Sequence, residues 1–159
     1  MARGKRFIRK RKARPDPVYG NVVVEKLVNR TMKDGKKSVT YKQVYNAFKT
    51  IEKAGKKPLE VFLEAIKNLS PQIEVRAKRI GGAAYQVPTP VRMERKTSLA
   101  IRWLVIEARK RSNKEYKTFA AKLAAEILDA VKGEGGAYKR KETIHKMAES
   151  NRAFSHFRW

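Results

Sequence analysis

The fold is decided by a stretch of alternating residues between two helical regions, residues 73–92, which read IEVRAKRIGGAAYQVPTPVR. Apolar or small side chains alternate with polar ones on both sides of Gly81-Gly82, and a period-two pattern around such a turn predicts a β-hairpin. Pro88 and Pro90 cannot donate ladder hydrogen bonds, so the second strand is expected to be irregular or to have a free edge. Cations fall on both faces, which indicates an arm that projects from the protein rather than a sheet lying on a core.

Outward from the hairpin, apolar residues recur at steps of three and four, the spacing of helices with one apolar face. Three helices are expected before the hairpin and three after it: Asn21 to Asp34, the Lys36-Lys37 turn to Ala54, Pro58 to Ser70, Thr97 or Ser98 to Ser112, Tyr116 to Val131, and residues 138–153. Gly35 is expected to end the first helix in the left-handed conformation, and Met147 to face inward from the last.

The predicted fold is therefore mainly α, a single domain of about six helices over residues 1–159. A basic N-terminal extension (1–15), the β-hairpin arm (72–92) and a C-terminal helix and tail (139–159) complete it.

The composition limits the classes of function. The chain has 159 residues, no cysteine, and 39 Lys and Arg against 15 Asp and Glu, a formal net charge of +24. The absence of cysteine excludes disulfides, thiolate zinc sites and cysteine nucleophiles, which fits a reducing compartment. No apolar run approaches the roughly 18 residues of a membrane-spanning helix, and the N-terminal residues lack the apolar stretch of a signal peptide. So large a positive surplus indicates a polyanionic partner, with nucleic acid first and an anionic membrane second.

The titratable residues show no catalytic or metal-binding pattern. His145 and His156 are 11 residues apart, which is no known metal spacing, and both are interpreted as surface or packing histidines. Glu60 and Glu64 have lysines nearby and are interpreted as partners in surface ion pairs. Gly81-Gly82 is followed by neither Lys-Ser nor a helix-opening pattern, so it is not a Walker-type phosphate loop. We therefore expect neither an enzyme nor a metal or other cofactor.

Nucleic-acid binding is the function class that remains. Exposed basic elements are expected to contact phosphates, and Arg is favoured where the contact is bidentate. The extension is expected to be disordered when free and to become ordered on RNA. The candidate residues are Arg3, Lys5, Arg6, Arg9, Lys10, Arg11, Lys12, Arg14, Lys36, Lys37, Arg76, Lys78, Arg79, Arg92, Arg95, Arg102, Arg109, Lys110 and Arg111.

Near the predicted tip, Tyr85 and Gln86 could stack on a base or hydrogen-bond to one, or Tyr85 could pack near Val87; the pattern leaves both open. Zinc-finger, basic-zipper and compact helix-turn-helix patterns are missing, so a wide basic coat with arms favours folded RNA over DNA. A membrane-binding protein would need a helix with a Lys and Arg face opposite its apolar face, whereas the segment ending at Val131 carries Glu126 and Asp129. An RNA-processing enzyme would need a clustered acid–base set, which the sequence lacks.

Several longer motifs, in order from about Arg11 to Trp159, resemble the bacterial-type small-subunit ribosomal protein seven family. They are DPVYG (16–20), MKDGKKS (32–38), EVRAKRIGGAAYQVP (74–88), RWL (102–104) and MAESNRAFSHFRW (147–159). Pro90 departs from the family, which usually has an acidic residue there, so a more frayed second strand is expected.

The resemblance implies a helical domain with a protruding β-ribbon that binds the 3′ major domain of small-subunit ribosomal RNA early and nucleates assembly of the subunit head. It implies that the ribbon approaches the exit-site tRNA and the mRNA, and that ribosomal proteins nine and eleven of the small subunit are neighbours. The terminal aromatic segment is expected to dock on RNA or on a neighbouring protein. The location would be the cytoplasm, or the plastid stroma for an organelle-encoded copy. The residues expected nearest the tRNA are Gly82, Ala83, Ala84, Tyr85 and Gln86.

Overall fold

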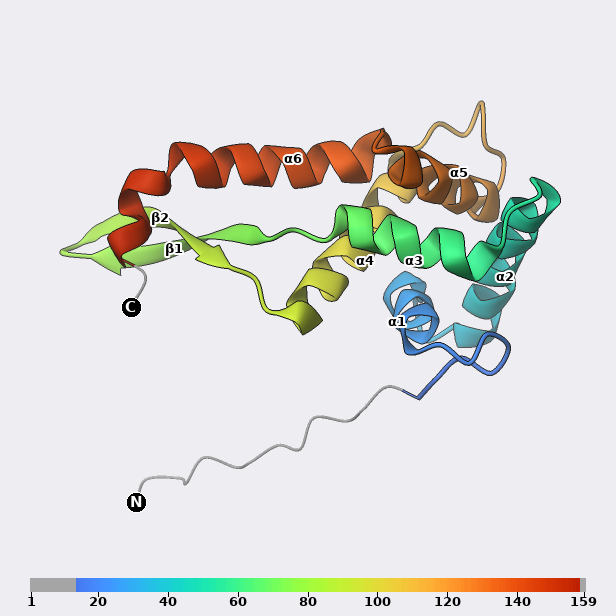
Figure 1. The fold of residues 1–159 in the computed structure, drawn as a ribbon. Helices are drawn as coiled ribbons and strands as arrows, with labels where there is room; N and C mark the ends of the chain where they lie inside the picture. The colour runs from blue at the N-terminus through green and yellow to red at the C-terminus, as the bar shows by residue number, and fades with distance from the viewer. Residues whose placement is uncertain (1–13, 158–159) are drawn as a thin grey trace, which may run out of the picture.

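The structure, a computed structural model, describes residues 14–157. In chain order its elements are α1 (Val22–Thr31), α2 (Lys37–Lys53), α3 (Pro58–Leu69), β1 (Ile73–Ile80), β2 (Ala83–Pro90), α4 (Met93–Lys110), α5 (Phe119–Lys132), α6 (Gly135–Ser150) and the 3-10 helix η1 (Arg152–Phe157). The helices form one body from which the hairpin projects, so the prediction of a mainly α fold with a hairpin arm is confirmed (Figure 1). Within this range no helix is both long and apolar enough to cross a membrane.

The core forms around α5, which packs against α2, α3, α4 and α6. Its apolar side chains recur on one face, and Leu123 and Ile127 are fully buried there. Phe48 of α2 and Phe62 of α3 are also fully buried, with ring centroids 5.5 Å apart. Each such side chain contributes roughly 1.5–3 kcal/mol on burial. The helical body therefore has a core of its own, to which the outer part of the hairpin adds little.

Both ends of α5 are set by local chemistry. The Thr118 hydroxyl accepts a hydrogen bond from the amide of Ala121 at 3.2 Å, so the helix begins at Phe119 rather than at Tyr116. Gly133, at a φ of +78°, ends the helix in the left-handed conformation. The last helix then begins at residue 135 rather than at the predicted residue 138.

The predicted end of the first helix is wrong. α1 ends at Thr31, where Met32 already has an extended ψ of 137°, and Gly35 lies farther on in the connecting turn, at a φ of +70°. Glycine therefore shapes the turn, not the helix end. Met147 was expected to face inward, but it is 52% exposed on α6.

The predicted start of the fourth helix is also wrong. α4 begins at Met93, several residues before the predicted cap at Thr97 or Ser98. The Thr97 hydroxyl donates to the carbonyl of Met93 at 3.4 Å, so it bonds back within the helix instead of capping it. As a result the candidate residue Arg95 lies in the first turn of α4.

The hairpin is a two-stranded antiparallel sheet that pairs Ile73 with Pro90 at its base and Ile80 with Ala83 at its tip. Both residues of the Gly81-Gly82 turn have positive φ, +58° and +92°, which suits a two-residue hairpin turn and which glycine adopts without strain. β2 extends through Pro90, so pairing continues where fraying was expected.

One side of the hairpin is covered. α6 runs toward the hairpin and η1 turns back across its outer part (Figure 1). Val87 of β2 is fully buried, whereas the opposed residues Arg79 and Ala84 near the tip are exposed. The arm projects as predicted, but the C-terminal segment supports it, which the alternation pattern did not indicate.

Candidate nucleic-acid interface

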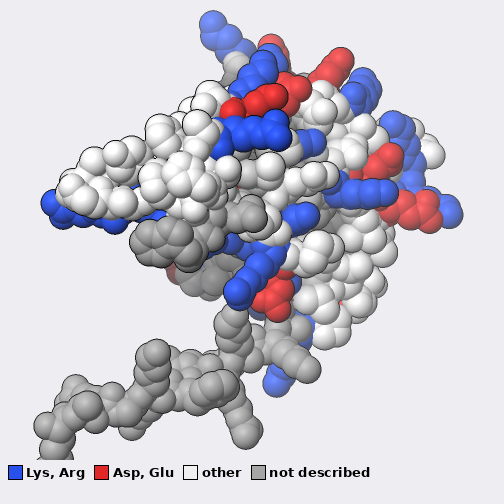
Figure 2. All heavy atoms as spheres, turned by 60° about the vertical axis from the view of Figure 1, so that its left-hand side comes forward, with Lys and Arg blue, Asp and Glu red and all other residues white. Residues whose placement is uncertain are grey.

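The positive charge is distributed widely over the protein. Figure 2 shows Lys and Arg side chains spread over the visible face, with Asp and Glu side chains among them. Of the predicted N-terminal candidates, Arg14 is exposed. The others lie outside the described residues: Arg3, Lys5, Arg6, Arg9, Lys10, Arg11 and Lys12.

Four predicted residues are placed to meet a ligand without breaking an internal contact. Lys36, Arg79, Arg92 and Arg102 are all exposed, and none has a carboxylate partner within residues 14–157. Lys36 lies at the N-terminal end of α2, Arg79 near the hairpin tip, Arg92 between the hairpin and α4, and Arg102 on α4. They are spread over three elements, α2, β1 and α4 with its N-cap, so a ligand that contacts all four must be large.

Two other candidates share one carboxylate at the base of the hairpin. Glu74 of β1 accepts hydrogen bonds from Arg76 at 2.5 Å and from Arg95 at 2.6 Å. Burial opposes ionisation of Glu74, but the hydrogen bonds from the two guanidinium groups outweigh burial and lower its pKa. This ion-pair cluster ties β1 to α4, and although Glu74 is buried, both arginine side chains remain about half exposed. They can contact a phosphate while still paired with Glu74.

Arg111 is held inside the protein. Its side chain is only 17% exposed, and it pairs with Asp129 and, at 2.6 Å, with Glu126 of α5. Glu126 also accepts a hydrogen bond from the amide of Ala137 at 2.8 Å. Burial lowers the pKa of Arg111, but the hydrogen bonds that Arg111 donates to Asp129 and Glu126 outweigh burial and raise it. This guanidinium therefore joins the end of α4 to α5, with little surface left for a ligand.

The remaining candidates on the helical body also have internal partners. Lys37 pairs with the buried Glu25 at 2.5 Å, Lys110 pairs with Glu107 at 2.9 Å, and Arg109 donates to the carbonyl of Thr31 at 2.8 Å. Lys110 is largely exposed despite its pair, and such surface pairs contribute little, about 0–1 kcal/mol. A phosphate could compete for Lys110 more easily than for Lys37.

At the hairpin tip the structure gives a third answer for Tyr85. Its ring packs against both Phe154 and Phe157 of η1, with ring centroids 5.3 and 5.4 Å away. The directly opposed Lys78 donates to the carbonyl of Phe157 at 3.1 Å. Tyr85 therefore neither projects for stacking nor packs near Val87 alone. It anchors the C-terminal segment to the arm.

Two rings of the terminal aromatic segment, Phe154 and Phe157 of η1, contact this chain's own hairpin, and docking of the segment on RNA or on a neighbouring protein stays a prediction. The signal that could have indicated this is their spacing of three residues, which places two rings on the same side of a helical turn. Of the residues expected nearest the tRNA, Gly82, Ala83, Ala84 and Gln86 are exposed. Gly82, Ala83 and Ala84 have no bulky side chain, which allows close approach of a ligand to the backbone.

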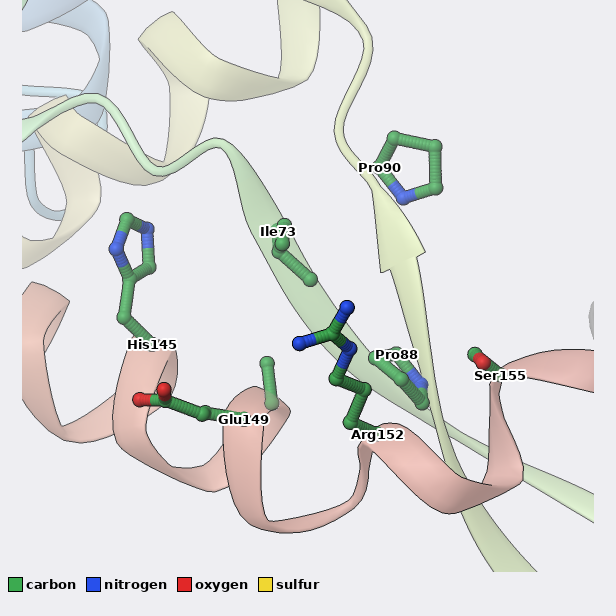
Figure 3. Close-up of a pocket in the computed structure, with 8 residues that line it drawn as sticks. Ile73, Pro88, Pro90, His145, Glu149, Arg152 and Ser155 are labelled. Carbon is green, nitrogen blue, oxygen red and sulfur yellow. The ribbon is translucent and has the colours of Figure 1, made fainter.

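A hollow of about 550 Å³ lies between α6 and the hairpin, and Figure 3 shows the Arg152 guanidinium turned into it toward Ile73. His145 borders the hollow, and its Nε2 accepts a hydrogen bond from the amide of Gln72 at 3.2 Å. Burial, with a smaller effect of Lys141, lowers the pKa of His145. The lining of the hollow has no nucleophile beside a base, and the described chain has no cluster of three metal-ligating side chains.

Known proteins resemble this chain over nearly its whole length. The family model described as Ribosomal protein S7p/S5e matches residues 3–152. "Small ribosomal subunit protein uS7" of Carboxydothermus hydrogenoformans is 58% identical over 151 residues, which are 94% of this chain and 95% of the relative. The proteins of the same name from Acetivibrio thermocellus and Caldicellulosiruptor bescii are each 56% identical, over 94% and 96% of this chain and 95% and 96% of their own lengths.

Proposed function

Because this chain belongs to the ribosomal protein S7p/S5e family, we propose that its exposed cations and its supported hairpin hold one defined region of ribosomal RNA. The chain is a structural constituent of the small ribosomal subunit and binds ribosomal RNA. It is not an enzyme. What remains to be proposed is which region it binds, and with which residues.

The region we propose is the 3′ major domain, which forms the head of the subunit, with this protein binding early and nucleating assembly of the head. The observation that carries the proposal is that exposed cations without a carboxylate partner in residues 14–157 are spread over α2, β1 and α4, at Lys36, Arg79, Arg92 and Arg102. Cations spread over several elements suit an RNA junction that surrounds the protein, because folded RNA is recognised by its shape and backbone. The N-terminal basic residues from Arg3 to Arg14 would extend the same contact.

The exposed tip of the hairpin is proposed to lie beside the exit-site tRNA and the mRNA. Gly82, Ala83 and Ala84 have no bulky side chains, and the packing of Tyr85 on η1 holds the turn in one orientation. Neighbouring small-subunit proteins nine and eleven are proposed as protein partners. The proposed location is the cytoplasm, or the plastid stroma for an organelle-encoded copy.

Fractionation of ribosomes with mapping of cross-links tests this proposal. A tagged copy of the chain, produced in bacterial cells, should migrate with small subunits at moderate salt and leave them at high salt. Its ultraviolet cross-links should map to the 3′ major domain. Cross-links spread evenly over the ribosomal RNA, or confined to another domain, would refute the proposed region.

A further inference from the structure

A second hollow, of about 360 Å³, lies between α1 and α4. Lys26, Asn29 and Arg30 line it from α1, and Ser98 and Ile101 line it from α4. Residues three and four apart in a helix share a face, so each wall is one face of one helix. The two helices pack on each other, and Ile101 is only 2% exposed. Core packing therefore fixes this α1–α4 groove in shape.

The charges on the lining of the groove are all positive. Lys26 and Arg30 are exposed, and neither has a carboxylate partner in the described chain. None of the described Asp and Glu side chains lines the groove, and Glu94, one turn before Ser98 on α4, does not border it. Arg102, also exposed, follows Ser98 by one turn on the same face and extends the positive wall. Such a groove suits the phosphates of a nucleic-acid strand.

Two neutral polar side chains of the same lining suit a ribose. The Asn29 amide donates to the carboxylate of Glu25 at 3.2 Å, which holds the side chain and leaves its carbonyl oxygen available as an acceptor. The Ser98 hydroxyl lies on the other wall, is exposed, and can donate or accept. The 2′-hydroxyl of RNA is itself both a donor and an acceptor, and it is the group that distinguishes RNA from DNA.

We propose that the α1–α4 groove binds a sugar-phosphate segment of one RNA strand and recognises its 2′-hydroxyl. The phosphates lie beside Lys26 and Arg30, and the 2′-hydroxyl hydrogen-bonds to Asn29 and Ser98. The volume is at the lower end of the roughly 300–1,000 Å³ of small-ligand sites, so the groove accepts part of a strand rather than a duplex. The site rests on the proposed function, because ribosomal RNA supplies the strand.

Removal of the two cations tests the phosphate contacts. Lys26→Ala with Arg30→Ala should reduce the slope of the logarithm of the binding constant against the logarithm of salt by about 1.4, because each single-strand phosphate contributes about 0.7. The probe is a transcript of the 3′ major domain. Lys49→Ala with Lys53→Ala is the matched control, since these exposed lysines of α2 are also four residues apart and have no carboxylate partner in the described chain. Equal changes in slope for the two pairs, or an unfolding midpoint lowered by several degrees in the first, would overturn the site.

Interference mapping tests the ribose contact. The transcript is made with occasional 2′-deoxy nucleotides, and the positions where they prevent binding are located by comparing bound and unbound RNA. The wild type and the control Ser150→Ala, on α6 and outside the groove, should show at least one such position that Ser98→Ala lacks. Loss of one hydrogen bond should weaken binding by Ser98→Ala about two- to tenfold.

The outcomes separate the site from the proposed function. The same interference pattern in Ser98→Ala and the wild type would overturn the site and leave the proposed function standing. If the wild type binds the 3′ major domain no more tightly than a 5′ domain transcript of equal length, the proposed function fails and the site fails with it.

Discussion

The contact between η1 and the hairpin gives the most specific prediction about this protein. Tyr85 lies 5.3 Å from Phe154 and 5.4 Å from Phe157, measured between ring centroids, and none of the three belongs to the main hydrophobic core. Each aromatic pair contributes about 0.5–1.5 kcal/mol beyond burial, so two pairs contribute about 1–3 kcal/mol. A two-stranded hairpin is marginally stable alone, so this energy should decide whether the outer arm stays closed.

Replacing Phe154 and Phe157 together by Ala should therefore increase hydrogen exchange of the paired amides in the outer hairpin by roughly 5- to 150-fold. Exchange in the buried helix α5 should not change, because the core is separate from the aromatic cluster. Native-state hydrogen exchange followed by NMR or mass spectrometry measures both. Ser155→Ala is the matched control, since Ser155 lies in the same 3-10 helix and takes no part in the ring contacts. Unchanged exchange in the hairpin, or an equal increase in α5, would refute the reasoning.

Three further predictions concern stability and binding. Because Glu74 has a pKa below its ordinary value of 4.5, its contribution to stability is present above that value and is lost as the pH falls through the lower folded-state pKa. Glu74→Gln should therefore reduce the loss of thermal stability at acid pH, and an unchanged pH profile would contradict this role of Glu74. Thr118→Ala should lower the free energy of unfolding by about 1 kcal/mol in urea titrations by removing the α5 cap, whereas Thr118→Ser should retain most of it, and equal losses would exclude capping as the cause. Arg79→Ala should weaken RNA binding and reduce by about 1 the slope of the logarithm of the binding constant against the logarithm of salt. The free energy of unfolding should change by no more than about 0.5 kcal/mol, and a large loss of stability would mean that Arg79 supports the fold.

Local patterns predicted most of the fold because their causes are local. The alternation around Gly81-Gly82 predicted the hairpin, since a two-residue turn with positive φ depends on the glycines themselves. The spacing of apolar residues predicted α5, and Gly133 marked its end. In contrast, the start of α4 at Met93 has no capping side chain, so nothing in the local sequence indicated it.

The candidate interface was less predictable because its contacts join residues far apart in the chain. Lys78 bonds to Phe157, and Arg95 of α4 bonds to Glu74 of β1, contacts that no local periodicity encodes. The sequence showed which residues are cationic, but only the fold separates the exposed Arg79 from Arg111, which is held by two carboxylates. Charge counting alone treated both as equivalent.

The central claim is that this basic protein binds folded ribosomal RNA through many phosphate contacts. Its most direct test is a gel-shift titration with a 3′ major domain fragment over a range of salt concentrations. If about eight phosphates are neutralised, the logarithm of the binding constant should fall with the logarithm of salt at a slope of about −6 to −7. The fragment should also bind more tightly than duplex DNA of equal length. A flat salt response, or equal affinity for the DNA, would contradict the claim.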